Sequence, residues 1–151
     1  MRSIRVFNKR TRRGKVVKVV REHYVRDDIP CAAAGCSVCD NTTDHTPVLL
    51  SETPYANRYL VIDTNVALHQ MDLLEHSCKA LCDVIVCQTV LEEVKHRNLA
   101  VSRRLASLIA DHSRRFILFA NEHHRGTYAH EMEGETPNDR NDRAIRNVAA
   151  W

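Results

Sequence analysis

The chain has 151 residues, of which 44% are hydrophobic, and a formal net charge of +3. This length suits one domain with an extension, and no apolar run approaches the roughly 20 residues of a membrane span, which excludes an integral membrane protein. The basic N-terminus has no apolar segment behind it, so it is no secretory signal peptide. We therefore expect a soluble intracellular protein that has no membrane as a partner.

The charge is divided unevenly along the chain. Residues 1–26 carry ten Lys and Arg against one Glu, a net +9, whereas the other 125 residues carry twelve against eighteen acids, a net −6. A basic arm on an acidic domain predicts contact with nucleic acid or with an acidic protein surface, and a solvated tail is the alternative. Because valines interleave with the charges, the arm is predicted to form a hairpin around Thr11–Gly14. Its candidate contacts to RNA or a partner are Arg10, Arg12, Arg13 and Lys15.

The sequence predicts three segments: the basic arm at 1–26, a cysteine-rich loop and linker at 27–57, and an α/β domain at 58–151. Apolar runs in the last segment predict buried strands at 58–63, 83–87 and 116–119. Helical spacing predicts helices from Val66 and from Ser102, and capping residues predict one capped by Thr89 and a last one capped by Asn138 or Asp139. Because strands and helices alternate, we expect a parallel sheet.

Three cysteines at C-x4-C-x2-C spacing lie in the loop: Cys31, Cys36 and Cys39. Thiolates at such spacing can converge on one Zn²⁺, with a fourth ligand from His23, His45 or a residue after the C-terminus. Three free thiols are the alternative. Nothing else indicates secretion, so a disulfide framework is disfavoured. The remaining cysteines fall on helix and strand positions and are predicted core residues: Cys78, Cys82 and Cys87.

Three acids are candidate ligands of a divalent cation. Asp63 stands at the end of the first buried strand, Glu93 is predicted in the first turn of the helix after the second strand, and Asp142 in the first turn of the last helix. The carboxyl ends of parallel strands share one sheet edge, where α/β folds bind ligands. Taken singly, Glu93 and Asp142 fit charges that complement a helix N-terminus, but Asp63 directly follows an apolar run and needs a partner. Jointly, the three predict a site for Mg²⁺ or Mn²⁺.

Paired histidines follow the third strand in Asn121-Glu122-His123-His124. Such a pair invites a metal hypothesis. Histidines in a loop more often pack or hydrogen-bond, so we predict a structural role for them.

Val61–Asn65 resembles the opening of a PIN domain, a metal-dependent ribonuclease fold. Four further stretches, in the same order along the chain, resemble the N-terminal part of the catalytic subunit of the eukaryotic RNA exosome, an RNase II/R-type ribonuclease: residues 20–29, 88–94, 119–125 and 138–146. An isolated Asp-Thr-Asn would be weak evidence, but the ordered set covers nearly the whole chain. The resemblance implies a three-layer α/β/α domain with a central parallel sheet whose C-terminal part is missing.

The resemblance also implies a function. It implies endoribonuclease activity on single-stranded RNA, with Mn²⁺ or Mg²⁺, as two ions, bound by Asp63, Glu93 and Asp142. Candidate supporting residues around these ligands are Thr64, Asn65 and Asp139. The implied context is docking on the exosome ring, an exonuclease body in the full protein, and RNA processing and decay in the nucleus, its nucleolus and the cytoplasm.

The chain departs from the family pattern at one point. PIN sites generally use a fourth acid after a further strand, and that strand would lie after Trp151. The alternative function is therefore a non-catalytic fragment that tethers a nuclease to its assembly. A nucleotide-binding domain is disfavoured, because the first strand is not followed by a G-x-G-x-x-G or Walker glycine pattern.

Overall fold

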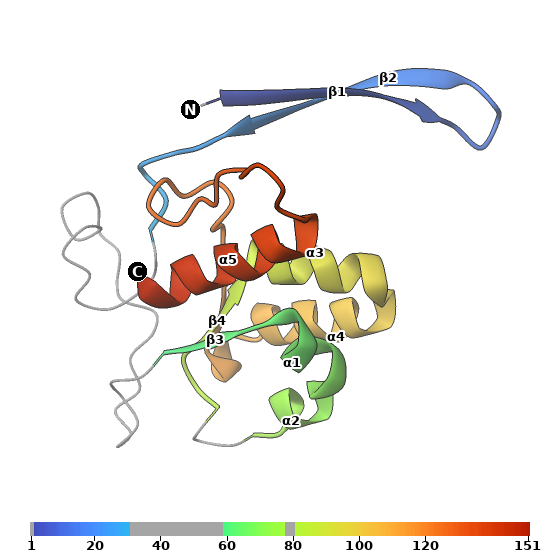
Figure 1. Cartoon of the computed structure of the whole chain (residues 1–151). Coiled ribbons are helices and arrows are strands. Elements are labelled where there is room, and N and C mark those ends of the chain that lie inside the picture. The colour runs from blue at the N-terminus through green and yellow to red at the C-terminus, as the bar shows by residue number, and fades with distance from the viewer. Residues whose placement is uncertain (1, 31–58, 78–80) are drawn as a thin grey trace.

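A computed structural model of the chain describes residues 2–30, 59–77 and 81–151 (Figure 1). The arm contains β1 (Arg2–Arg10) and β2 (Val16–Tyr24). The domain contains three strands, β3 (Leu60–Ile62), β4 (Val84–Cys87) and β5 (Phe116–Phe119). Its helices are α1 (Thr64–His69), α2 (Met71–Glu75), α3 (Gln88–Arg97), α4 (Leu99–Ala110), the 3-10 turn η1 (His112–Arg114) and α5 (Pro137–Ala150). The three cysteines of the predicted zinc site lie outside the described residues.

The three domain strands form a parallel sheet in the order β3-β4-β5. The central strand, β4, is buried at all four positions, as expected of a strand covered on both faces. Helix α3 packs against β4, α4 against β5 and α5 against β3. The alternation of strands and helices in the sequence therefore predicted the fold class correctly, although the first strand is shorter than the predicted 58–63.

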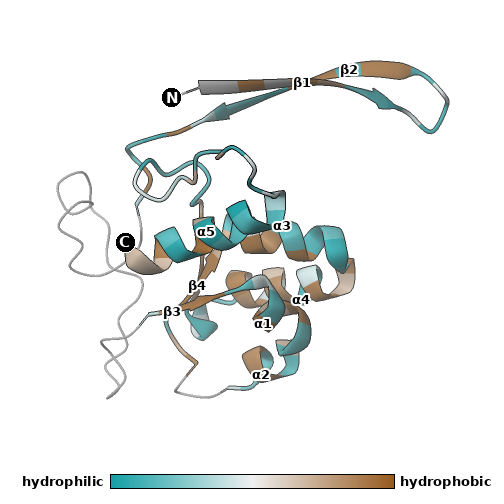
Figure 2. Ribbon diagram, viewed as in Figure 1, coloured by the Kyte–Doolittle hydropathy of each residue, from teal (hydrophilic) through white to brown (hydrophobic). Residues whose placement is uncertain are grey.

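The core consists mainly of branched aliphatic side chains from the sheet and the helices that face it. Several are fully excluded from solvent, including Val84, Val86, Val90, Val94 and Leu105. Figure 2 shows the same segregation, with hydrophobic colour concentrated on the sheet and on the inner sides of the helices. Burial of such side chains contributes about 1.5–3 kcal/mol each. Cys87 is also fully buried, as predicted for a core cysteine, and burial raises the pKa of its thiol to about 12.

The arm forms an antiparallel hairpin that projects from the domain (Figure 1). Its turn lies at the predicted Thr11–Gly14, where Gly14 donates its N–H to the Thr11 carbonyl at 2.9 Å. Gly14 has φ 78°, a value that favours glycine. The root of the hairpin is attached to the domain, because the N–H of Arg26 donates to the carbonyl of His123 at 2.7 Å and the N–H of Arg125 donates to that of Arg26 at 3.0 Å.

The helices predicted from Val66, Thr89 and Ser102 all begin earlier than expected. Helix α1 begins at Thr64, since Asp63 caps it. Helix α4 begins at Leu99 rather than Ser102, since the Asn98 side chain accepts the N–H groups of Ala100 and Val101 at 3.1 and 3.2 Å. Helix α3 begins at Gln88, so Thr89 lies inside the helix and does not cap it.

The last helix is also capped before the predicted position, two residues before Asn138 and three before Asp139. Its N-cap is Thr136, whose hydroxyl accepts the N–H of Asp139 at 3.2 Å while the Asp139 carboxylate accepts the N–H of Thr136 at 3.2 Å. These shifts place Glu93 and Asp142 each at the sixth position of its helix. Both acids therefore lie in the second turn, and the prediction that they occupy the first turn is wrong.

Asn121 connects the end of β5 to the start of α3. The side chain is fully buried, its Nδ2 donates to the Thr89 hydroxyl at 2.8 Å, and its Oδ1 accepts the Thr89 N–H at 3.3 Å. A buried polar group that loses its partner destabilises a protein by about 1–3 kcal/mol.

We expect Asn121→Ala to lower the free energy of unfolding by about 1–3 kcal/mol, because it leaves the buried Thr89 N–H without an acceptor. Urea unfolding followed by circular dichroism measures this change. Asn65→Ala, at an exposed position of α1, is the matched control and should change stability by less than about 0.5 kcal/mol. Equal effects of the two substitutions would contradict this role for Asn121.

Candidate functional site

Asp63 lies directly after β3, at the carboxyl edge of the sheet. Its side chain caps helix α1, with one carboxylate oxygen accepting the N–H of Val66 at 2.7 Å. The residue is exposed to solvent. The expected partner of the Asp63 carboxylate is therefore a backbone N–H group. The positive end of the α1 dipole also stabilises its negative charge.

Glu93 is the best-anchored acid at this edge. The Thr64 hydroxyl donates to its Oε2 at 2.9 Å, the Asn141 amide donates to the same oxygen at 3.3 Å, and Arg97 pairs with Oε1 at 2.5 Å. Its side chain is only 13% exposed. Glu93 therefore joins α1, α3 and α5 by direct polar contacts.

These contacts bring the neighbourhoods of the three candidate acids together. Thr64 follows Asp63 in the chain, and Asn141 precedes Asp142, which is exposed. Within residues 2–30, 59–77 and 81–151, however, no three His, Cys, Asp or Glu side chains form a group that could hold a metal ion. The assignment of Asp63, Glu93 and Asp142 as joint ligands stays a prediction.

The three candidate supporting residues differ in their surroundings. Thr64 is buried and contacts Glu93, whereas Asn65 is exposed. Asp139 belongs to the capping box of α5, where hydrogen bonds from Thr136 lower the pKa of its carboxyl. Its observed contacts are thus those of a helix cap.

Two residues at this edge were not singled out from the sequence. Arg97 follows Glu93 by four positions on α3. Because this spacing predicts an ion pair on a helix, the sequence alone could have indicated the contact. Asn141 is 48 residues from Glu93 in the chain, and only its place beside Asp142 pointed toward the site.

The paired histidines have the structural role that the sequence predicted. His124 is buried, its ring lies 5.2 Å from that of Phe119 and 4.9 Å from that of Trp151, and burial lowers its pKa. The ring of His123 stacks on that of His23 at 4.6 Å, and its Nδ1 lies 3.0 Å from the Tyr24 carbonyl. His23, a candidate zinc ligand, is thus part of the junction between arm and domain.

The basic residues at the tip of the hairpin are all exposed: Arg10, Arg12, Arg13 and Lys15. Arg10 donates from Nε to the Gly14 carbonyl at 3.4 Å, across the turn. Among the residues that the structure describes, no helix has the length and apolar character needed to cross a membrane.

The sheet, its helices and the acidic edge define a PIN domain. The family model described as "PIN domain" matches residues 60–151, and the chain belongs to that family. It is 46% identical to "Exosome complex exonuclease RRP44" from Homo sapiens over 155 residues, and 45% identical to "Exosome complex exonuclease RRP44 homolog A" from Arabidopsis thaliana over 147 residues. Both alignments cover 97% of this chain, but only 16% of the human and 15% of the plant protein.

A solved structure supports the same relationship. "Structure of T. brucei RRP44 PIN domain" superposes with a TM-score of 0.71 at 28% identity, covering 84% of this chain and 66% of that chain. The PIN-like α/β fold that the sequence predicted is therefore confirmed. The chain is a PIN domain that matches the RRP44 type of exosome subunit.

We expect Thr64→Val to lower the free energy of unfolding by about 1–3 kcal/mol, because it removes a hydrogen bond to a mostly buried carboxylate while keeping the side-chain shape. Thr64→Ser is the control, since it removes a methyl group but keeps the donor to Glu93. Urea unfolding of both variants at one pH separates the two effects. A larger loss for the serine variant than for the valine variant would refute the importance of this hydrogen bond.

Proposed function

We propose that this chain is a metal-dependent endoribonuclease domain that hydrolyses phosphodiester bonds in single-stranded RNA, as part of RNA processing and decay in the nucleus and cytoplasm. Membership of the PIN family supports a nuclease, and the relatives are named as exosome ribonucleases. Beyond family membership, we propose that cleavage is endonucleolytic and that it requires a metal ion.

The observation that carries the proposal is the anchoring of Glu93. Hydrogen bonds from Thr64 and Asn141 hold this carboxylate in place. These two donors are the chain neighbours of Asp63 and Asp142. A partly buried acid held by donors from two other elements is expensive to maintain for folding alone, because replacing such groups with apolar side chains is often neutral or stabilising. A functional requirement for the charge explains why the position is acidic.

The chemistry of the donor set fits Mg²⁺ or Mn²⁺, because carboxylate oxygens are the ligands these hard ions prefer. Asp63, Glu93 and Asp142 are the residues that would hold them. When bound, one or two such ions activate water and stabilise the charge that develops on the phosphodiester.

The other residues of the site act on the ligands. Thr64 and Asn141 fix the orientation of Glu93 by donating to one of its oxygens. Arg97 offsets part of the negative charge that several carboxylates concentrate at one place. Such supporting contacts at metal sites typically contribute about 10- to 100-fold in affinity or activity.

Asp63→Asn in the full-length protein should lower the endonucleolytic rate by more than about 100-fold, since it removes a ligand charge at nearly constant shape and exceeds the loss typical of a supporting residue. Circular RNA with Mn²⁺ is the substrate, because it has no ends for an exonuclease. Asp72→Asn, on the exposed face of α2, applies the same chemical change away from the site and should retain activity. Undiminished cleavage by Asp63→Asn would rule out the proposed role.

The second candidate function is tethering, in which the chain attaches a nuclease to the exosome ring with or without cleaving RNA itself. The arm favours this function. Both faces of the hairpin expose apolar side chains. One exposes Phe7 and Val17, but the other exposes more of them, with Val6 54% and Val20 53% exposed. The same face also carries Ile4, Val16 and Tyr24, because residues that pair across the two strands share a face. Figure 2 shows a hydrophobic stretch on β2, to which valines of both faces contribute.

An exposed apolar patch with charged neighbours is typical of a protein interface. A tail that only follows RNA phosphates needs no such surface. We therefore assign this face, which we call the outer hairpin face, to a ring subunit of the exosome.

The double substitution Val6→Thr/Val20→Thr should weaken association with isolated exosome ring by more than about tenfold, because each valine contributes roughly 1.5 kcal/mol or more when buried. Threonine keeps the β-branched shape and so preserves the hairpin. Val17→Thr/Val19→Thr makes the same change on the opposite face and should bind normally. Surface plasmon resonance provides the comparison, and wild-type binding by the first variant would overturn the assignment.

The cysteines of the loop at residues 27–57 form a separate part of the proposal. Thiolates at C-x4-C-x2-C spacing bind Zn²⁺ strongly, and a completed site contributes folding energy. Elemental analysis of the full-length protein should show about one zinc that is lost on combined substitution of Cys31, Cys36 and Cys39 by serine. Cys82→Ser is the control and should retain the metal. A zinc content unchanged by the triple substitution would count against the site.

A further inference from the structure

A pocket of ≈ 290 Å³ lies where the root of the hairpin meets the domain. Its walls come from β2, α3, α5 and the turn at residues 121–128, which we call the β5 turn. The side chains that matter here are Arg21, His23, His123, Tyr128 and Arg140. The volume is close to the lower end of small-ligand sites, about 300 Å³, and suits one nucleobase with part of its sugar.

Aromatic rings form one side of this pocket, which we call the junction pocket. His23 and His123 stack with their centroids 4.6 Å apart and an interplanar angle of 17°. The ring of Tyr128 lies 5.3 Å from that of His23, and the guanidinium of Arg140 lies 5.7 Å from the Tyr128 centroid. Proteins bind unpaired bases of RNA by stacking them on such aromatic rings and on guanidinium planes.

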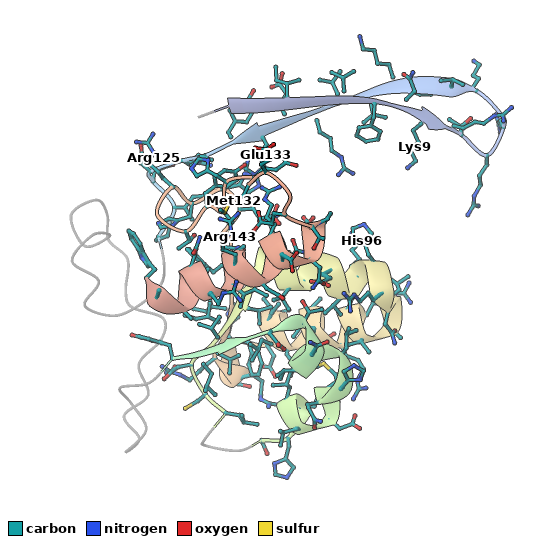
Figure 3. All side chains as sticks on the ribbon, viewed as in Figure 1. Lys9, His96, Arg125, Met132, Glu133 and Arg143 are labelled. Carbon is teal, nitrogen blue, oxygen red and sulfur yellow. The ribbon has the colours of Figure 1, made fainter. Side chains whose placement is uncertain are left out.

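The rings are fixed before any ligand binds. His123 is held by the Tyr24 carbonyl 3.0 Å from its Nδ1, and Arg140 donates from Nε to the Ala129 carbonyl at 3.0 Å. The hairpin wall is fixed to the domain by Arg125, which pairs with Asp27 at 2.7 Å and lies at the junction in Figure 3. A surface ordered in advance loses less entropy when it binds.

The charges of the junction pocket suit a base that carries an amino group. Arg21 and Arg140 supply positive charge for a phosphate. Three glutamates also line it, Glu22, Glu92 and Glu122, and carboxylates accept hydrogen bonds but donate none when ionised. Cytosine offers an N4 amino donor at the position where uracil offers an O4 acceptor. The three carboxylates therefore favour the amino group of cytosine over the O4 carbonyl of uracil at equal size.

The junction pocket adjoins the acidic edge of the sheet. Glu92 lines the pocket while Glu93, the next residue on α3, contacts Asn141. On α5, Arg140 lines the pocket and precedes Asn141. A smaller cavity of ≈ 60 Å³, lined by both of these α5 residues, lies between the two places.

We propose that the junction pocket is a subsite that holds one unpaired base of the RNA substrate, with preference for cytosine over uracil. This subsite would position an RNA strand next to the three candidate acids. The role in positioning rests on the proposed nuclease function. The subsite also assigns a role to His123 of the β5 turn and to the ring of His23 that stacks on it.

Binding of fluorescent ten-nucleotide oligo(C) and oligo(U) to the full chain, in EDTA and low salt, tests the proposal without cleavage. Wild-type protein should bind oligo(C) at least about fivefold more tightly, since one discriminating contact of this kind is worth about 1–3 kcal/mol. Tyr128→Leu should weaken oligo(C) binding by at least about fivefold through loss of stacking. Ultraviolet cross-links to oligo(C) should map to the peptide that contains His123 and Tyr128.

If Tyr128→Leu fails to fold, Arg21→Gln still tests the proposal, because Arg21 is exposed and its substitution leaves the core intact. It should weaken oligo(C) binding more than Lys18→Gln, which removes the same charge from the opposite face of β2. Equal effects of these two substitutions, or cross-links only elsewhere in the chain, overturn the proposal and leave the pocket to a protein side chain. Equal affinity for oligo(C) and oligo(U) overturns the assigned base preference.

The outcome is distinguishable from that of the nuclease proposal. If circular RNA is not cleaved but oligo(C) binding depends on Arg21 and Tyr128, the subsite stands and the endonuclease assignment fails. If cleavage requires Asp63 while both pocket variants bind oligo(C) normally, the endonuclease assignment stands and the subsite fails.

Discussion

The carboxylate of Glu93 is the constraint on which the acidic edge depends. It is largely shielded from water and receives hydrogen bonds from α1 and α5 while pairing with Arg97 on its own helix. A buried charge is tolerated only when it is paired and hydrogen-bonded, so these three donors must keep their positions. Their positions in turn fix how α1 and α5 lie against α3. The packing of three helices and the placement of one acid are therefore a single requirement.

The β5 turn imposes a second constraint, because it connects the sheet to the arm. At its start Asn121 holds Thr89 at the beginning of α3, and two residues later His123 holds the root of the hairpin. The distance along the chain between these two attachments is very short. The root of the arm and the start of the helix that carries Glu93 are consequently attached to the same short turn.

Local patterns in the sequence predicted the elements better than their ends. Apolar runs located the strands, since β4 is buried throughout and β5 matches its predicted span. The helix starts failed where an upstream residue supplies the cap, as Asn98 does for α4 and Thr136 for α5. Competing cap residues lie within a few positions of each other, and their hydrogen bonds depend on the chain direction that tertiary packing sets.

Contacts between segments far apart in the chain could not be predicted from the spacing of residues in the sequence. Asn141 and Glu93 are 48 residues apart, and Tyr24 and His123 are 99 residues apart. The candidate acids were found because each follows a strand or begins a helix, which is local information. The residues that orient them, and the ring pair between the arm and the domain, arise only when the helices and hairpin pack.

The hairpin shows how its two parts can have different roles. A two-stranded ribbon by itself is marginally stable in water, since it has no third strand or covering helix to bury its side chains. Here the root is stabilised by the domain through His23 and Arg26, whereas the outer hairpin face leaves Ile4, Val6 and Val20 in solvent. Arg21 and His23 of the junction pocket lie on the same two-stranded ribbon as the outer hairpin face, so a partner on that face would also stabilise the strand that carries them. Docking of the arm would thereby add a second support to one wall of the proposed subsite, beside the contacts that the domain already makes, and so link attachment to the assembly with binding of the substrate.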